Sequence, residues 1–395
     1  MKKILICSHW MEIGGAERAL LGLLNSIDYS KYQVDLYLCR HTGEFMKFIP
    51  DEVNLLPEDP KAASIAIPIK EVIKKGFLDI VIGRIIAKIK TRQYLKKHSE
   101  DMNNIAVEYS NKYTYKYVKN INTEIEYDLA ISFLEPHYIA AYKTKAKKKI
   151  AWMHTDYGTI SVDVDEGYKI WSKFDHVVAI SEECWNGFCQ KYPLLEAKLV
   201  LIENIIHPQF IQQQSKSFEV DEEMPEDGSI KLLSIGRFCE AKNFDNVPEI
   251  CKNLLKLGLD IKWYLIGYGG CEALIRKKIE EHGMENNVII LGKKENPYPY
   301  ILKCDIYVQP SRYEGKAVSV CEAQCLGKPV VITDYPTAKS QIEDKVDGFI
   351  IPMDNKQSAK KLAALIKNRA DLDKVALYCA ENKSRSKTDI KNYII

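Results

Sequence analysis

Residues 306–332 read IYVQPSRYEGKAVSVCEAQCLGKPVVI, and this stretch decides the fold. The run 306–309 is apolar and ends at a proline, a helix is expected to begin near Ala317, and a second apolar run covers 329–332. Short apolar runs joined by a helix are typical of neighbouring parallel strands in a sheet that is covered on both faces. The stretch therefore predicts a strand, helix and strand unit of an α/β domain.

The same rhythm occurs in two series along the chain. The expected strands of the first series are 4–7, 34–39, 129–133, 150–153 and 177–180, and those of the second are 231–235, 262–266, 288–291, 306–309 and 329–332. A polar, acidic stretch with Pro225 and Gly228 separates them and is typical of a linker. We therefore predict two Rossmann-like, doubly wound domains that face each other across a cleft.

The chain length agrees with two domains, because 395 residues exceed the usual size of a single domain. The hydrophobic content of 46% is enough to form a large core. We predict a first domain at 1–210, a linker at 211–229 and a second domain at 230–373. A terminal helix at 374–395 would pack back on the first domain.

Composition excludes several classes of protein. A formal net charge of +2 gives no sign of a nucleic-acid partner. Eleven cysteines without a CxxC pair argue against a disulfide framework or a zinc site, and they favour a reducing compartment such as the cytoplasm. No run approaches the roughly 18 apolar residues that a membrane-spanning helix needs. A membrane contact would therefore be peripheral, at the inner face of the plasma membrane.

The segment 61–118 departs from the strand and helix rhythm, since it is long, helix-permissive and basic. Isoleucines and a valine alternate with its basic residues at 80–89. One interpretation is a helix that rests on anionic lipid, and the other is a solvated helix whose isoleucines face the domain core. Both remain open at this point.

Two carboxylates, Glu314 and Glu322, lie eight positions apart in the quoted stretch. Backbone N–H groups of Gly315, Lys316, Ala317 and Val318 would open the helix between them and form an anion site. Eight helical residues give roughly 12 Å of rise, so the carboxylates would lie at the two ends of a bound diphosphate. Carboxylates bind hydroxyls well, which assigns a sugar to Glu314 and a ribose to Glu322. The alternative is that Glu322 is an acid on the helix surface.

A second cluster follows the first strand of the second domain. There Gly236 permits a tight turn, and Arg237 and Lys242 supply two cations. Fixed cations would stabilise the negative charge that develops on a departing diphosphate. Taken alone, the two cations could equally be solvated loop residues.

The first domain offers two further candidates. Gly14 and Gly15 follow the first strand and open a helix, which is where such domains bring the backbone close to a ligand, although the turn could be structural. His154 ends the strand 150–153, at the sheet edge where ligands collect, or it is a structural histidine. The turn lacks the full dinucleotide fingerprint, so no nicotinamide or flavin cofactor is expected.

These residues resemble the family 4 retaining glycosyltransferases of the GT-B fold, over nearly the whole chain. The resemblance rests on Gly14 and Gly15, on His154, on Arg237 with Lys242, and above all on the stretch 314–322. It implies that Arg237 and Lys242 contact the donor diphosphate, Glu314 the donor sugar and Glu322 the ribose. His154 would lie beside the transferred sugar, and the Gly14 turn would face the donor or the acceptor.

The implied activity is metal-independent, retaining transfer from a nucleotide-diphosphate sugar, with a UDP-sugar as the expected donor. The second domain would bind that donor, and the first would lie on the acceptor side. The expected acceptor is a lipid-linked or oligosaccharide chain of a bacterial surface glycan such as a capsule or exopolysaccharide. The alternatives are an inactive nucleotide-sugar-binding scaffold and an epimerase of the same architecture. Lys316 departs from the aromatic or aliphatic residue of many relatives, which leaves the donor sugar open.

Overall fold

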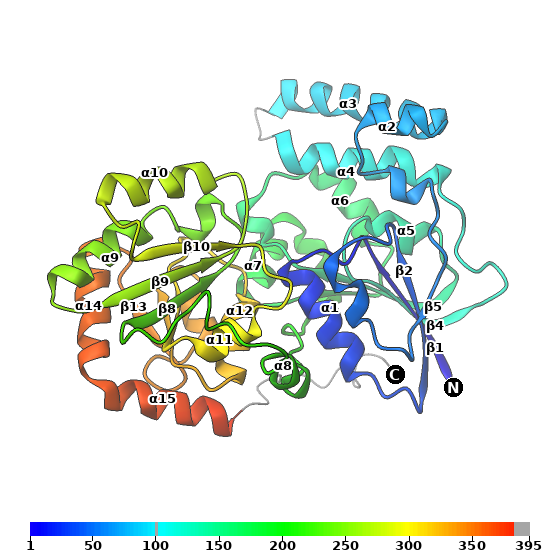
Figure 1. The fold of residues 1–395 in the computed structure, drawn as a ribbon. Helices are drawn as coiled ribbons and strands as arrows, with labels where there is room; N and C mark the ends of the chain where they lie inside the picture. The colour runs from blue at the N-terminus through cyan, green and yellow to red at the C-terminus, as the bar shows by residue number, and fades with distance from the viewer. Residues whose placement is uncertain (99–101, 383–395) are drawn as a thin grey trace. The chain divides into compact units, whose positions relative to one another are not determined.

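The computed structural model describes residues 1–98 and 102–382, which form two compact units (Figure 1). The first is Met1–Ile205, and the second begins at Ile206. Each unit contains a fully parallel sheet with helices on its faces, which confirms the predicted α/β architecture of two Rossmann-like units.

The first unit is built on a seven-stranded sheet with the order β3-β2-β1-β4-β5-β6-β7. The strands are β1 (Lys2–Ser8), β2 (Tyr32–Leu38), β3 (Asn54–Leu55), β4 (Tyr127–Ser132), β5 (Ala146–Met153), β6 (His176–Ala179) and β7 (Leu199–Leu201). The order reverses direction between β1 and β4, and such a reversal is where ligands collect at the carboxyl ends of strands.

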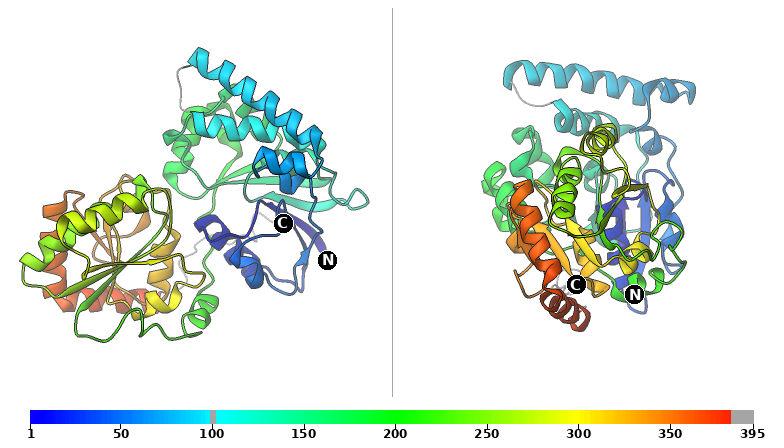
Figure 2. Two further views of the ribbon diagram at one scale, coloured as in Figure 1. Left: turned by 45° about the horizontal axis from the view of Figure 1, so that its top comes forward. Right: turned by 60° about the vertical axis from the view of Figure 1, so that its left-hand side comes forward.

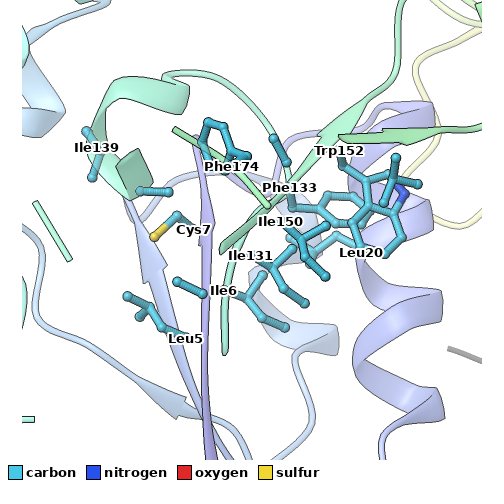
Figure 3. Packing of buried hydrophobic residues seen from close by; sticks show 14 of the residues in the cluster. Leu5, Ile6, Cys7, Leu20, Ile131, Phe133, Ile139, Ile150, Trp152 and Phe174 are labelled. Carbon is cyan, nitrogen blue, oxygen red and sulfur yellow. The ribbon is translucent and has the colours of Figure 1, made fainter. Parts of the chain in front are cut away.

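Helices cover this sheet, and buried apolar side chains fill the space between (Figure 3). Trp152 and Phe133 pack against each other there, with ring centroids 5.3 Å apart. The helices are α1 (Gly15–Ser26), α2 (Ile69–Lys74), α3 (Leu78–His98), α4 (Met102–Thr114), α5 (His137–Tyr142), α6 (Val164–Trp171) and α7 (Glu182–Lys191). Short 3₁₀ helices occupy Glu44–Phe48, Ala62–Ser64, Tyr115–Tyr117, Tyr157–Thr159 and Pro193–Lys198.

Helix α3 lies on the outside of the first unit and packs against α4, as Figure 1 and both views of Figure 2 show. Gly83 permits this close packing, since a β-carbon there would lie 2.5 Å from the Tyr113 carbonyl oxygen. One stripe of α3 is buried and consists of Ile80, Gly83, Ala87 and Thr91. A second stripe is 47% to 61% exposed and consists of Leu78, Ile82, Ile85 and Ile89. The interpretation in which the isoleucines face a core therefore holds for Ile80 but not for the exposed stripe.

The second unit has a six-stranded sheet with the order β10-β9-β8-β11-β12-β13. Its strands are β8 (Ile230–Ile235), β9 (Ile261–Ile266), β10 (Val288–Gly292), β11 (Ile306–Gln309), β12 (Val330–Thr333) and β13 (Phe349–Ile351). Neighbouring residues such as Leu232 and Leu233 enter different buried clusters, because successive side chains of a strand point to opposite faces. Both faces are therefore covered, as the continuous apolar runs predict.

The helices of this unit are α8 (Pro208–Gln214), α9 (Val247–Lys256), α10 (Glu272–His282), α11 (Tyr298–Lys303), α12 (Val318–Cys325), α13 (Ala338–Gln341), α14 (Asn355–Lys367) and α15 (Arg369–Glu381). A 3₁₀ helix covers Glu240–Lys242. Within residues 1–98 and 102–382, no helix is both long and apolar enough to cross a bilayer.

The predicted linker and the predicted terminal helix differ from the elements of the structure. The stretch 211–229 is not a free linker, because Val220 and Met224 are buried in the second unit and its first part is helical. Burying these two side chains gives the stretch a hydrophobic reason to stay with that unit. The helix predicted for 374–395 corresponds in part to α15, while 383–395, where a return to the first domain was expected, lies outside the described residues.

Candidate functional site

The loops that follow β8 and β11 meet at the carboxyl edge of the second sheet. These strands are neighbours, so their ends lie side by side. The backbone N–H of Arg312 donates to the Ala241 carbonyl at 2.7 Å, and Asn243 Nδ2 donates to the Pro310 carbonyl at 2.8 Å. The predicted cation cluster and the predicted glutamate motif therefore form one site.

Glu314 lies at the centre of this site. Its Oε1 accepts hydrogen bonds from Lys242 Nζ at 2.5 Å, from Ser311 Oγ at 2.5 Å and from Gln309 Nε2 at 2.9 Å. The side chains of Lys242 and Glu314 are 19% and 10% exposed, so water competes little with their pairing. Three donors on one oxygen fix the carboxylate in place and balance its charge.

Arg237 and Lys242 differ in their surroundings. Lys242 is held by Glu314, and its aliphatic stem passes Gly236 so closely that a β-carbon there would lie 3.1 Å from it. The Arg237 side chain is exposed. Of these two predicted cations, Lys242 is thus fixed in an ion pair and Arg237 is exposed to solvent.

The stretch 314–322 is not helical throughout, because α12 begins at Val318. Glu314 therefore belongs to the turn before the helix, and the assumption that eight helical residues separate it from Glu322 is wrong. The predicted anion site is also partly filled: the Ala317 N–H donates to Gln341 Oε1 at 2.6 Å. Gly315 and Lys316 lie in the turn and are partly buried, and Val318 starts the helix.

Glu322 is 1% exposed, so the alternative of a surface acid is wrong. Its Oε1 accepts a hydrogen bond from the hydroxyl of Tyr298 at 2.9 Å. A buried carboxylate needs such partners, since burial without them is costly. Tyr298 fixes Glu322 in the part of α12 that follows the predicted anion site.

Two glycines after β9 allow the loop there to pack closely against the loop that follows β8. A β-carbon on Gly267, whose φ is +154°, would lie 1.9 Å from the Gly236 carbonyl oxygen. A β-carbon on Gly269 would lie 2.5 Å from the Phe238 carbonyl oxygen. The β8 and β9 loops can approach this closely only because neither residue has a side chain.

In the first unit, Gly14 precedes α1 and Gly15 begins it, as predicted. The buried carboxyl of Glu17 fills the space beside Gly14, where a β-carbon would lie 2.1 Å from Glu17 Oε2. Trp10 Nε1 donates to Glu17 Oε1 at 3.0 Å. The glycine turn is therefore packed around Glu17.

His154 follows β5, as predicted, with its ring 4.7 Å from the ring of Phe133. Burial lowers the pKa of His154 to about 4, although a hydrogen bond to the Phe133 backbone acts in the opposite direction. Its Nε2 is buried and has no hydrogen-bond partner among the described residues. At neutral pH the ring is therefore uncharged.

Sequence reasoning missed Gln309, Ser311, Tyr298 and Gln341, each of which contacts a predicted residue. Of these four, only Gln309 could have been recognised from the sequence, because it is a polar residue at the end of an apolar strand. Among the described residues, no group of three or more His, Cys, Asp and Glu side chains is placed to hold a metal ion.

Part of the chain matches the model of a known protein family. A model described as glycosyl transferases group 1 matches residues 215–385. The predicted family resemblance is confirmed for this stretch. The group 1 match contains Arg237, Lys242, Glu314 and Glu322, whereas Gly14, Gly15 and His154 lie outside it.

Curated relatives match over parts of their length. The amylovoran biosynthesis glycosyltransferase AmsK of Erwinia amylovora is 31% identical over 38% of this chain and 39% of its own. An N-acetylgalactosamine-N,N'-diacetylbacillosaminyl-diphospho-undecaprenol 4-alpha-N-acetylgalactosaminyltransferase of Campylobacter jejuni is 25% identical over 48% of this chain and 50% of its own. The chain thus spans half or less of the length of these relatives.

Solved structures resemble the fold of the whole chain, not only that of residues 215–385. Anabaena Alr3699/HepE in complex with UDP-glucose has a TM-score of 0.65 and 16% identity. The alignment covers 100% of this chain and 98% of that one. At this identity the likeness concerns the fold alone, and it shows the two-unit GT-B architecture.

Proposed function

We propose that the protein is a retaining, metal-independent glycosyltransferase that moves a sugar from a UDP-sugar to a growing surface glycan. The observation that carries this proposal is the Lys242 and Glu314 pair, which is half-buried after adjoining strands within the group 1 match. The names of the relatives support transfer to a glycan, and HepE, which has the same fold, was crystallised with UDP-glucose.

The contacts support a division of roles. All three donors to Glu314 within the described residues contact Oε1, which leaves Oε2 for the hydroxyls of the donor sugar. Arg237 and Lys242 would meet the diphosphate, and Glu322 the ribose. Preorganised charges of this kind stabilise a leaving group because they need no reorganisation during the reaction.

In the proposed step, the bond between the anomeric carbon and the phosphate oxygen breaks as the acceptor oxygen bonds to that carbon from the same face. The acceptor proton passes to the departing phosphate oxygen. No protein base is required, and the negative charge on the diphosphate develops beside Arg237 and Lys242.

Nucleotide binding provides the direct test. UDP at 100 times its dissociation constant should stabilise the protein by about 2.7 kcal/mol, which is measured as a shift in melting temperature, whereas GDP should act more weakly. Glu322→Gln keeps the shape of the buried side chain and should lose most of the response. Glu281→Gln, which changes an exposed helix acid paired with Lys278, is the matched control. If no nucleotide stabilises the wild type, the donor assignment is wrong, and stabilisation without turnover favours a scaffold.

We also propose that the exposed stripe of α3 contacts the surface of an anionic membrane, which would hold a lipid-linked acceptor nearby. On this part of the chain, exposed basic residues far outnumber exposed acids: Lys70, Lys74, Lys75, Lys88, Lys90, Arg92, Lys96 and Lys97 against Glu71. Each cation near an anionic surface adds about 1 kcal/mol of attraction. The free thiols of all eleven cysteines support a cytoplasmic site of action.

Vesicle binding tests this surface. The wild type should sediment with vesicles that contain anionic lipid, and less with zwitterionic ones. Ile82→Glu should weaken binding at least tenfold, because it removes about 1.5–3 kcal/mol of apolar burial and adds repulsion. Leu377→Glu, on the exposed face of α15, is the control and should bind as wild type does. Equal losses in both variants, or equal binding to both kinds of vesicle, would contradict the proposal.

A further inference from the structure

The first unit contains a cavity of about 280 Å³ that none of the roles above uses, apart from His154. It lies at the carboxyl ends of β4 and β5, between these strands and α4. Open α/β sheets bind ligands at this edge. The polar lining consists mainly of Glu108, Asn111, Glu135, His137 and His154.

Aromatic side chains form much of the remaining wall, and no lysine or arginine is among the described residues that line the cavity. The aromatic residues are Tyr138, Trp152, Tyr157, Trp171 and Tyr192. A phosphate or other anion would meet carboxyl groups here and no cation to pair with. Rings packed beside a few polar groups suit a ligand that has both an apolar face and hydroxyls.

Glu108, His137 and His154 are largely uncharged at neutral pH. Burial, with a smaller contribution from the nearby carboxyl of Glu135, raises the pKa of Glu108 to about 8, and burial also raises the pKa of Glu135. Burial lowers the pKa of His137 to about 3 and that of His154 to about 4. Glu108, His137 and His154 therefore present neutral groups to a ligand, which suits hydroxyl groups.

Several of these groups are already fixed. Asn111 Nδ2 donates to Glu135 Oε2 at 3.0 Å, and His137 Nδ1 lies 2.8 Å from Ser132 Oγ. His154 also lines the cavity, but its Nε2 has almost no exposed surface and no partner among the described residues, so a ligand would meet other atoms of this residue.

We propose that this cavity binds an uncharged sugar ring, the terminal residue of the acceptor. The inference rests on the proposed glycosyl transfer and adds the chemistry of the acceptor. A whole nucleotide sugar is a poorer occupant, because it carries a diphosphate and the described lining of the cavity includes no cation to pair with it. The acceptor end selected by this cavity is a neutral hexose or N-acetylhexosamine without phosphate or carboxylate.

The test is a titration of the wild type, with UDP present, by methyl glycosides of neutral hexoses and N-acetylhexosamines, followed by tryptophan fluorescence. Trp152 and Trp171 line the cavity and serve as reporters. At least one neutral glycoside should bind, and glucose 6-phosphate should not. Val107→Trp places a large side chain at an exposed position of the wall and should weaken binding at least tenfold. Leu194→Trp, at an exposed position outside the cavity, is the control.

The outcomes separate this inference from the proposed function. If UDP stabilises the protein but no neutral glycoside binds, or if Val107→Trp binds as the control does, the cavity assignment is wrong while the donor assignment stands. If a glycoside binds and is lost in Val107→Trp but no nucleotide binds, the cavity assignment stands and the transferase proposal fails.

Discussion

Replacing Lys242 by alanine is expected to lower kcat/KM for sugar transfer from a UDP-sugar by about 10²–10³-fold, the usual effect of removing one preorganised charge partner. The variant removes a cation at the proposed leaving group and also leaves the Glu314 carboxylate without its ion-pair partner. Steady-state kinetics with a radiolabelled donor measure the effect, and a thermal melt shows whether the second unit stays folded.

Lys262→Ala is the matched control, because Lys262 pairs with Asp227 at the surface and contacts no residue of the site. Surface pairs contribute little, so this variant should keep nearly full activity. Glu314→Gln should resemble Lys242→Ala in activity, since it removes the carboxylate charge and keeps the side-chain shape. Near wild-type kcat/KM in Lys242→Ala would remove the central support for the proposed mechanism.

Replacing Gly267 by alanine is expected to destabilise the second unit by about 3 kcal/mol or more, through an unfavourable φ and a clash with backbone. The new β-carbon would lie 1.9 Å from the Gly236 carbonyl oxygen, and a carbonyl cannot rotate away as a flexible side chain can. The measurement is the free energy of unfolding from urea denaturation.

Gly258→Ala provides the comparison, because Gly258 also has positive φ, +80°, but a β-carbon there would have no neighbour within 4 Å. This variant should cost only about 1–2 kcal/mol, the conformational term. If both variants lose the same stability, the close contact of the two loops contributes nothing and only the φ of Gly267 matters.

The strands were largely predictable, because an apolar run such as 306–309 is buried on both faces and carries its own signal. Three edge strands, β3, β7 and β13, were missed since they comprise two, three and three residues, too few for a pattern. The exposed stripe of α3 could not be told from a core stripe, because period alone does not say which apolar face has a partner.

Site residues that directly follow a strand could be predicted from the sequence. Contacts between residues far apart in the sequence could not, because they depend on tertiary packing. Glu314 and Lys242 were placed in one site, yet their direct pairing joins residues 72 positions apart and follows from the β8 and β11 pairing. Gln341, which accepts a hydrogen bond from the Ala317 N–H, lies 24 positions further along the chain, so its contact also depends on tertiary packing. The cavity acids Glu108 and Glu135 belong to no motif, and only the fold brings them together.

Helix α4 is shared by the two proposed contacts of the first unit. Its Glu108 and Asn111 line the cavity, while Ile105 and Tyr109 on another face pack against α3. A shift of α3 at a lipid surface would therefore move one wall of the sugar pocket. Such linkage is reciprocal: the factor by which the membrane changes affinity for the sugar equals the factor by which the sugar changes affinity for the membrane. If that factor is favourable, an acceptor anchored in the bilayer is preferred over the same glycan free in water, without any contact to its lipid.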